Sequence, residues 1–293
     1  MTLNGKRARH PELGRRQRQT GSDAWDAFAP RRDRHRDWTN AIALPVTQWL
    51  VDAVAVQPGE TVLELAAGAG DVGFAIHRRL RPAVRLISSD VSPAVVDVAR
   101  RAAAELGLDG IEFRMLDAQA LDMPSASVDA VVCPWGFMLM EDPRAALRET
   151  ARVLRPGGRL AFSVWGDPDR NPWTTIDAEI CAHVGYAPET TPTGPGGISS
   201  LADPGELRAT VHASGLVIRR LESVPVVLPY SDVKDYIAHE IEQPGRRGDF
   251  FRGLAVGKRA QAGQLASSLL EPYRANIGYL VPGETLNVLA VHR

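Results

Sequence analysis

An apolar run that ends in a carboxylate and passes directly into a turn of small residues is the part of this chain best suited to hold a nucleoside. The run is Val62–Leu65, with Glu64 as the carboxylate, and the turn is Ala66-Ala67-Gly68-Ala69-Gly70. Small side chains in such a turn let the backbone approach a bulky ligand closely. Glu64 adds an acceptor for a cationic group. The segment therefore predicts a nucleoside site with an acid beside it.

The glycines alone leave two kinds of nucleotide site open. Gly68–Gly73 matches the G-x-G-x-x-G pattern of dinucleotide sites, after an expected strand and before an expected helix. However, a dinucleotide turn has no need for an acid at Glu64, whereas a cofactor with a cationic amino-acid portion does need one. The neighbouring acid therefore favours the second kind of site.

Two further carboxylates follow the next two expected strands. Asp90 closes the second strand, and Asp117 follows the third, with Ala118 beside it. Asp90 can accept hydrogen bonds from ribose hydroxyls, and Asp117 can accept one from an exocyclic amine. Because the carboxyl ends of parallel strands meet at one edge of a sheet, these acids are expected to share one crevice with Glu64.

These residues belong to an alternation of strands and helices, which predicts a parallel sheet with crossover helices. Helix starts are marked by a capping residue before proline at Ser92-Pro93, Asp142-Pro143 and Asp203-Pro204. The first five strands are expected at Thr61–Leu65, Val84–Ser89, Ile111–Met115, Val128–Cys133 and Arg159–Val164.

The alternation falters after Trp165. Residues 166–200 are rich in Pro, Gly and Thr and predict an irregular insertion. A short last strand after a long excursion indicates an edge inserted antiparallel into the sheet. The later elements expected are a helix at Trp173–Val184, a strand at Leu216–Leu228, helices near Ser231–Ile241 and Arg252–Leu270, and a last strand at Thr285–Val291.

Val62–Gly70, Asp90, Asp117-Ala118 and the run Arg152–Leu160 together resemble class I S-adenosylmethionine-dependent methyltransferases. The branch most similar is that of the small-molecule enzymes of the ubiquinone/menaquinone-biosynthesis type. The resemblance is strong over Thr61–Trp165 and weaker over Asp203–Leu228 and the last strand. It implies an α/β fold: a Rossmann-like, doubly wound, seven-stranded sheet with the last strand antiparallel, N-terminal helices, and a helical cap from the late insertions.

The resemblance also implies how S-adenosylmethionine is held: its methionine portion by Glu64 and the glycine turn, its ribose by Asp90, its adenine by Asp117 and Ala118. Ala66 stands where many relatives have a glycine, which is tolerable if φ stays negative. The Leu154–Gly158 turn would reverse the chain into the fifth strand. The expected cofactor-binding residues are Glu64, Ala66, Gly68, Gly70, Asp90, Val91, Asp117, Ala118 and Cys133.

The chemistry so implied places few demands on the substrate side. Displacement at a sulfonium needs mainly an aligned nucleophile and exclusion of water, and a base only if the nucleophile arrives protonated. The aromatic and methionine residues at Trp135–Met140 predict an apolar pocket, with core packing as the alternative for any single member. The pocket candidates are Trp25, Phe28, Trp135, Met138, Trp165 and Tyr236.

No catalytic residue is specified by the sequence. His183, Tyr236 and His239 are weak candidates for a base. Cys133-Pro134-Trp135-Gly136 departs from the pattern of enzymes that methylate nucleic-acid bases, and no carboxylate suited to a chelate follows before Glu141. We therefore expect no metal and disfavour nucleic acid as a partner.

The composition is that of an ordinary globular protein: 293 residues, 44% hydrophobic, 24% charged and a net charge of -1. No run approaches the ~20 apolar residues of a membrane span, and two distant cysteines fit a reducing cytoplasm. Five segments are expected. They are a disordered basic tail at 1–21, an N-terminal helical lid at 22–58, a cofactor-binding core at 59–165, substrate-cap insertions with part of the sheet at 166–282, and a final core strand at 283–293.

These observations predict a cytoplasmic, metal-independent methyltransferase that acts on oxygen, carbon or nitrogen of a small, largely apolar or aromatic metabolite, in secondary metabolism. Three alternatives stay open: a non-methylating descendant that is cyclase-like or regulatory, a nucleic-acid or protein methyltransferase that uses the basic arm, and an NAD(P)-dependent oxidoreductase. The oligomeric state is not specified, although leading helices of this kind can exchange between the subunits of a homodimer.

Overall fold

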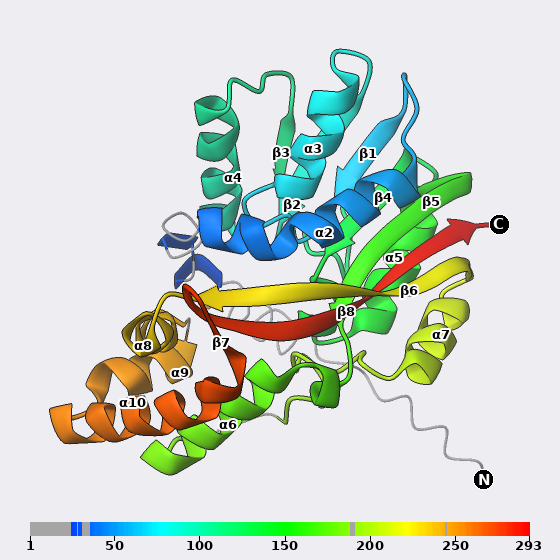
Figure 1. The fold of residues 1–293 in the computed structure, drawn as a ribbon. Coiled ribbons are helices and arrows are strands. Elements are labelled where there is room, and N and C mark those ends of the chain that lie inside the picture. Colours follow the sequence, from blue (N-terminus) through cyan, green and yellow to red (C-terminus); the bar gives the residue numbers. More distant parts are fainter. Residues whose placement is uncertain (1–24, 28, 31–35, 188–190, 244) are drawn as a thin grey trace, which may run out of the picture.

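Parallel strands joined by helices build the centre of the fold (Figure 1). The computed structural model describes residues 25–27, 29–30, 36–187, 191–243 and 245–293. The expected tail at 1–21 and Phe28 lie outside these residues.

The main sheet has seven strands in one path. All neighbours from the first edge to β5 are parallel, whereas β8 is antiparallel to both strands beside it. A two-residue strand, β7 (Arg274–Ala275), pairs with β8 off this path. This topology confirms the expected seven-stranded sheet. Its order is β3 (Glu112–Met115), β2 (Arg85–Asp90), β1 (Thr61–Glu64), β4 (Val128–Pro134), β5 (Leu154–Trp165), β8 (Gly278–His292) and β6 (Leu216–Tyr230).

The last strand differs from the expectation in place and length. β8 is antiparallel as expected, but it begins at Gly278 and lies between β5 and β6, so that β6 forms the edge. Val288 pairs with Phe162 on one side and with Leu221 on the other. A strand with two neighbours satisfies its backbone groups on both sides, which a short edge strand does not.

The run Leu154–Gly158 is also not a free turn before the fifth strand. It belongs to β5, and the register jumps there from Leu154 opposite Val128 to Arg159 opposite Ala130. Gly157 takes φ +78°, which glycine adopts without steric cost. The segment is therefore an irregularity within the strand, as in a β-bulge.

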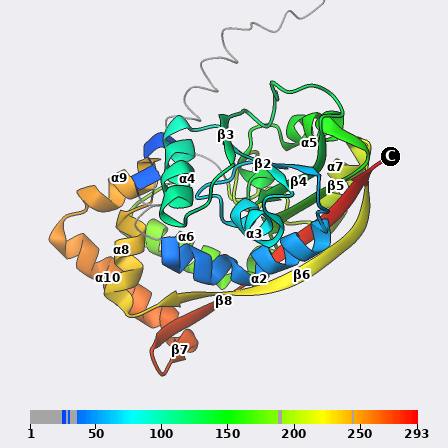
Figure 2. The ribbon, with the colours of Figure 1, turned by 90° about the horizontal axis from the view of Figure 1, so that it is seen from above.

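Helices cover both faces of the sheet (Figure 2). Successive strand residues face opposite sides: Val62 packs with α2 (Arg36–Val54), α3 (Asp71–Leu80) and α4 (Pro93–Glu105), and Leu63 packs with α5 (Pro143–Val153) and α7 (Pro204–Ala213). The same alternation holds in the neighbouring strands, as expected for a sheet buried on both faces.

Three helix starts confirm the capping residues expected from the sequence. The Ser92 hydroxyl accepts from the Val95 N–H at 3.0 Å, starting α4. Asp142 caps α5 by accepting from the Ala145 N–H at 2.9 Å, and Asp203 caps α7 in the same way. Each cap satisfies a donor that has no partner inside its helix.

A helical cap lies at the carboxyl end of β6 (Figure 1). It contains α6 (Pro172–Val184), α8 (Val233–Ile241), α9 (Gly245–Gly253) and α10 (Val256–Leu270). The single helix expected near Arg252–Leu270 is therefore two helices. The described part of the chain also contains three short 3-10 helices: η1 (Phe137–Leu139), η2 (Pro168–Arg170) and η3 (Glu271–Tyr273).

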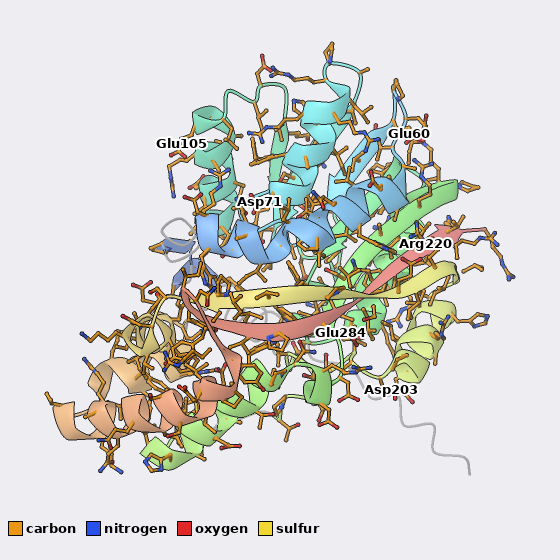
Figure 3. The ribbon with its side chains drawn as sticks, viewed as in Figure 1. Glu60, Asp71, Glu105, Asp203, Arg220 and Glu284 are labelled. Atoms are coloured by element: carbon orange, nitrogen blue, oxygen red, sulfur yellow. The ribbon has the colours of Figure 1, made fainter. Side chains whose placement is uncertain are left out.

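The leading segment forms α2, which begins at Arg36, and residues 25–27 and 29–30 are helical as well. Arg36 lies 3.9 Å from the Asp71 carboxylate, where α2 meets the start of α3 (Figure 3). Among the described residues, no helix is both long and apolar enough to span a bilayer.

An ion cluster joins three helices of the cap. Arg247 of α9 lies 2.9 Å from the Asp177 carboxylate of α6 and also pairs with Glu240 of α8. The Tyr236 hydroxyl donates to Asp177 at 2.6 Å. Because these groups are largely shielded from water, each charge depends on its partners rather than on solvent.

We predict that Arg247→Ala lowers the free energy of unfolding by about 3–5 kcal/mol, because two buried carboxylates lose their cation. Chemical denaturation measures the change. Arg148→Ala is the control, since Arg148 lies at the surface, 3.9 Å from Asp142, and exposed pairs contribute about 0–1 kcal/mol. Equal effects of the two substitutions would contradict the structural role of the cluster.

Candidate cofactor and substrate site

The glycine turn after β1 is tight and fixed by backbone hydrogen bonds. The Ala67 N–H donates to the Ser89 carbonyl at 2.9 Å, and the Gly70 N–H donates to the Ala67 carbonyl at 2.8 Å. Gly70 has φ +86°, and a Cβ atom there would lie 2.5 Å from the Phe74 ring. The turn therefore requires glycine at this position, both for the backbone conformation and for the close approach of α3.

The backbone conformation of Ala66 differs from the one expected from the sequence. Its φ is +49°, not negative. A left-handed conformation costs a residue with a Cβ atom about 1–2 kcal/mol. Trp135, after the neighbouring strand β4, also has positive φ, at +51°. Strained backbone of this kind clusters at functional sites, where the surrounding structure enforces it.

Asp90, at the end of β2, connects the glycine turn with the loop before α4. Its two carboxylate oxygens accept from the Gly68 N–H and the Ser92 N–H, each at 3.2 Å. Val91, between Asp90 and Ser92, is partly buried. The structure thus places Asp90 directly against the turn, which is where a group that binds ribose would lie.

Asp117, after β3, has one satisfied and one unsatisfied carboxylate oxygen. Oδ1 accepts from the backbone and the side chain of Gln119, at 2.9 and 3.3 Å. Oδ2 is shielded from solvent and has no hydrogen-bond partner among the described residues. Ala118 beside it is buried. A buried acceptor without a donor is costly, so this atom fits a ligand that brings an amine.

Glu64 does not lie as the sequence suggests. Its carboxyl group is fully buried and turned to the first turn of α3, where it accepts from the Gly73 N–H at 2.9 Å and from the Ser88 hydroxyl at 3.3 Å. Burial raises its pKa from the usual 4.5 to about 8, with the nearby Asp71 and Asp90 adding to the shift. This position supports α3 directly, and contact of Glu64 with a cofactor stays a prediction.

The leading segment adds a contact that sequence reasoning missed. Asp26 accepts from the Ser92 hydroxyl and from the Ala94 N–H, at the start of α4. Ala29 and Trp25 pack with Ala69 of the glycine turn. Trp25, expected to line the substrate pocket, therefore lies beside the cofactor turn. Asp26, the acid next to Trp25 in the sequence, was the signal from which this contact could have been predicted.

Cys133 and Met138 are part of the core. Both are buried in the cluster that β4 forms with α5. The backbone N–H groups of Gly136 and Phe137 donate to the Cys133 thiol, but burial raises its pKa well above the usual range. A raised pKa disfavours Cys133 as a nucleophile, and its contact with a cofactor stays a prediction. Met138 packs in the core, which was the alternative to a pocket role.

Trp135 and Trp165 end the adjacent strands β4 and β5 and stack on each other, with ring centres 5.4 Å apart and planes at 23°. Trp165 meets Trp173 of α6 edge-on at 4.9 Å. The structure thus brings two of the predicted pocket residues together at the carboxyl edge of the sheet. Together with Trp173 they form an aromatic wall.

The three candidate bases lie in the cap. His183 is exposed on α6. Tyr236 is buried, and burial together with Asp177 raises its pKa well above the usual 10, so it stays protonated and is a poor base. His239 is buried, with its ring 4.2 Å from the Trp38 ring. A catalytic role for any of them stays a prediction.

Asp90, Asp117 and the small-residue turn lie at the carboxyl edge of an open α/β sheet, which is where such sheets bind ligands. Residues 62–158 match a family model described as a methyltransferase domain. Over these residues the chain therefore resembles class I S-adenosylmethionine-dependent methyltransferases, and within them the ubiquinone/menaquinone branch, as the sequence predicted.

One sequence relative and two solved structures illustrate the likeness. The ubiquinone/menaquinone biosynthesis C-methyltransferase of Hahella chejuensis is 34% identical over 122 residues, which cover 41% of this chain and 49% of that protein. The chain spans about half the length of the curated relatives it matches. A putative methyltransferase of Bacillus halodurans matches with a TM-score of 0.58 at 16% identity, covering 84% of this chain and 97% of the other. The cyclase SpnF matches with a TM-score of 0.53 at 21% identity, covering 84% and 79%.

The raised pKa of Glu64 predicts a pH dependence of stability. Between its usual pKa of 4.5 and its folded value of about 8, the folded protein holds a proton that the unfolded chain has released. Stability from this group is therefore complete at low pH and lost as pH rises through that interval. Relative to Glu64→Gln, the wild-type free energy of unfolding should fall between about pH 5 and pH 8 and level off above. Urea denaturation at several pH values checks this, and a constant difference between the two proteins would contradict it.

Proposed function

We propose that this protein transfers a methyl group from S-adenosylmethionine to a small, largely apolar or aromatic molecule. The observation that carries the proposal is the buried Asp117 Oδ2 without a partner among the described residues. Asp117 follows Leu116, whose N–H donates to the carbonyl of Asp90 at 2.9 Å. An adenine amine supplies the missing donor, and ribose hydroxyls suit Asp90. When bound, this cofactor supplies an electrophilic methyl group on a charged sulfur.

The chain's own contribution is positioning. Asp90 and the Gly68 turn fix the nucleoside, and the aromatic wall of Trp135 and Trp165 stands where β4 and β5 end. Such a wall excludes water and aligns a flat acceptor, which is what an in-line displacement mainly requires. The proposal includes no metal ligand and no fixed base, and it leaves the methylated atom as oxygen, carbon or nitrogen.

The substrate class follows from the aromatic wall and from the relatives. The similar Hahella enzyme is named for C-methylation in quinone biosynthesis, so a reduced quinone ring is the first acceptor to test. A cyclase-like activity is the second candidate, because SpnF shares the fold. A cytoplasmic location, a role in secondary metabolism and a homodimer stay proposals as well.

Asp90→Ala should weaken binding of S-adenosylhomocysteine by about 1.5–3 kcal/mol, or roughly tenfold to a hundredfold. Isothermal titration calorimetry measures the affinity. Asp109→Ala is the matched control, because Asp109 is an almost fully exposed acid. Unchanged binding in the Asp90 variant would remove this residue from the site.

Methyl transfer itself is tested with S-adenosylmethionine and a panel of acceptors: 1,4-naphthoquinols, simple phenols and single-stranded oligonucleotides. We expect S-adenosylhomocysteine and a methylated naphthoquinol by mass spectrometry, with the same rate in excess EDTA. Loss of activity that Mg²⁺ restores would contradict the metal-free mechanism. Tight cofactor binding without transfer to any acceptor would favour the cyclase-like alternative.

A further inference from the structure

The indole N–H of Trp135 is a buried donor without an acceptor. Its Nε1 atom is shielded from solvent and has no hydrogen-bond partner among the described residues. Other tryptophans of the described chain are satisfied: Nε1 of Trp38 donates to the Pro229 carbonyl at 2.7 Å, and Nε1 of Trp49 donates to Glu222 at 2.7 Å. Buried indole N–H groups usually have a partner, so Trp135 is the exception that needs a reason.

The backbone of Trp135 is held in place from two sides. Its N–H donates to the carbonyl and the hydroxyl of Ser163 on β5, at 3.0 and 3.2 Å. The next residue is Gly136, where a Cβ atom would lie 2.6 Å from the Cys133 sulfur and 2.7 Å from the Ala66 Cβ atom. Trp135 is thus fixed, in its strained conformation, one residue from a close contact with the start of the glycine turn.

The ring of Trp135 is fixed as well. One face stacks on Trp165, which meets Trp173, whose Nε1 donates to Asn171 at 3.1 Å. Asn171 in turn is hydrogen-bonded to both backbone groups of Glu284 on β8: its Oδ1 accepts from the N–H at 3.0 Å, and its Nδ2 donates to the carbonyl at 3.1 Å. The three-tryptophan stack is therefore anchored to the sheet, and its N–H groups cannot easily turn to find other acceptors.

Trp135 also lies at the carboxyl edge of the sheet, directly after β4. Together with Trp165 it packs against the hydrophobic clusters of both sheet faces. The residue as a whole keeps partial exposure. Its neighbour Gly136 lies against Ala66 at the start of the glycine turn.

We propose that Trp135 binds the substrate: its indole N–H donates to a carbonyl or phenolic oxygen on an aromatic ring system that lies against the three-tryptophan stack. This inference rests on the proposed function and narrows its substrate class. The donor needs a lone pair on the ligand, which a protonated amine does not offer, and the tryptophan faces favour a planar ring over an aliphatic chain.

The test uses the full-length protein saturated with S-adenosylhomocysteine and two probes of equal shape, 1-tetralone and tetralin. Only the first has an oxygen acceptor. We expect the wild type to bind 1-tetralone about tenfold more tightly than tetralin, which corresponds to about 1.4 kcal/mol. Trp135→Phe keeps a stacking ring but lacks the N–H, and should bind both probes with the affinity that the wild type has for tetralin. Trp49→Phe, which loses an indole N–H outside the site, should behave as the wild type.

A second measurement uses only the wild type, so it does not depend on whether the Trp135→Phe variant folds. In spectra of ¹⁵N-labelled tryptophan indoles of the wild type, 1-tetralone should shift one signal and slow its deuterium exchange, and tetralin should not slow it. Three results would overturn the assignment. They are equal affinity of the wild type for the two probes, absence of binding by both probes, and unchanged deuterium exchange of every indole N–H. Failure of S-adenosylhomocysteine to bind at the outset would instead refute the proposed function.

Discussion

Parallel pairing of the central strands is the constraint on which the site depends. Glu64 on β1 is level with Ser88 on β2 and with Val132 on β4, so all three strands end at the same edge of the sheet. The loops that follow must then leave side by side. This is why residues far apart in the chain, such as Gly68 and Asp90, lie within hydrogen-bond distance and why open sheets of this kind bind ligands at their carboxyl edge.

The buried polar groups at this edge of the sheet are of two kinds. Some are satisfied inside the protein and support it, as Glu64 does under α3 through Gly73. Others are shielded but unpaired, namely Asp117 Oδ2 and Trp135 Nε1. An unpaired buried group is costly, and its retention at a ligand edge is explained when the ligand supplies the partner. In the proposed reaction, the Asp117 acceptor would bind the nucleoside and the Trp135 donor would bind the methyl acceptor.

The helical cap uses a different physical principle. Its helices are tied by the buried ion cluster around Arg247 and by aromatic packing among Trp38, Tyr230 and Tyr236. Trp38 comes from α2, so the leading helix and the late insertions share one core although more than 190 residues separate Trp38 from Pro229, its hydrogen-bond acceptor. Tyr236, one of the candidate bases in this region, packs in this core and donates its hydroxyl to Asp177; a catalytic role for it stays a prediction.

The sequence by itself determined the local elements. The strands β1 to β4, the caps at Ser92, Asp142 and Asp203, and the glycine turn all follow from side-chain periodicity and from backbone donors that only a few residue types satisfy. Asp90 and Asp117 could be placed at strand ends for the same reason. These features depend on neighbours within a few positions along the chain.

Only the tertiary structure decided which groups meet and which stay unpaired. The insertion of β8 between β5 and β6, the inward turn of Glu64, the positive φ of Ala66 and the stack of Trp135 on Trp165 all arise from contacts between distant segments. The solvent exposure and the hydrogen-bond partners of a side chain are properties of the packed protein. They depend on elements that are distant in the sequence, and sequence periodicity does not show which of these elements pack together.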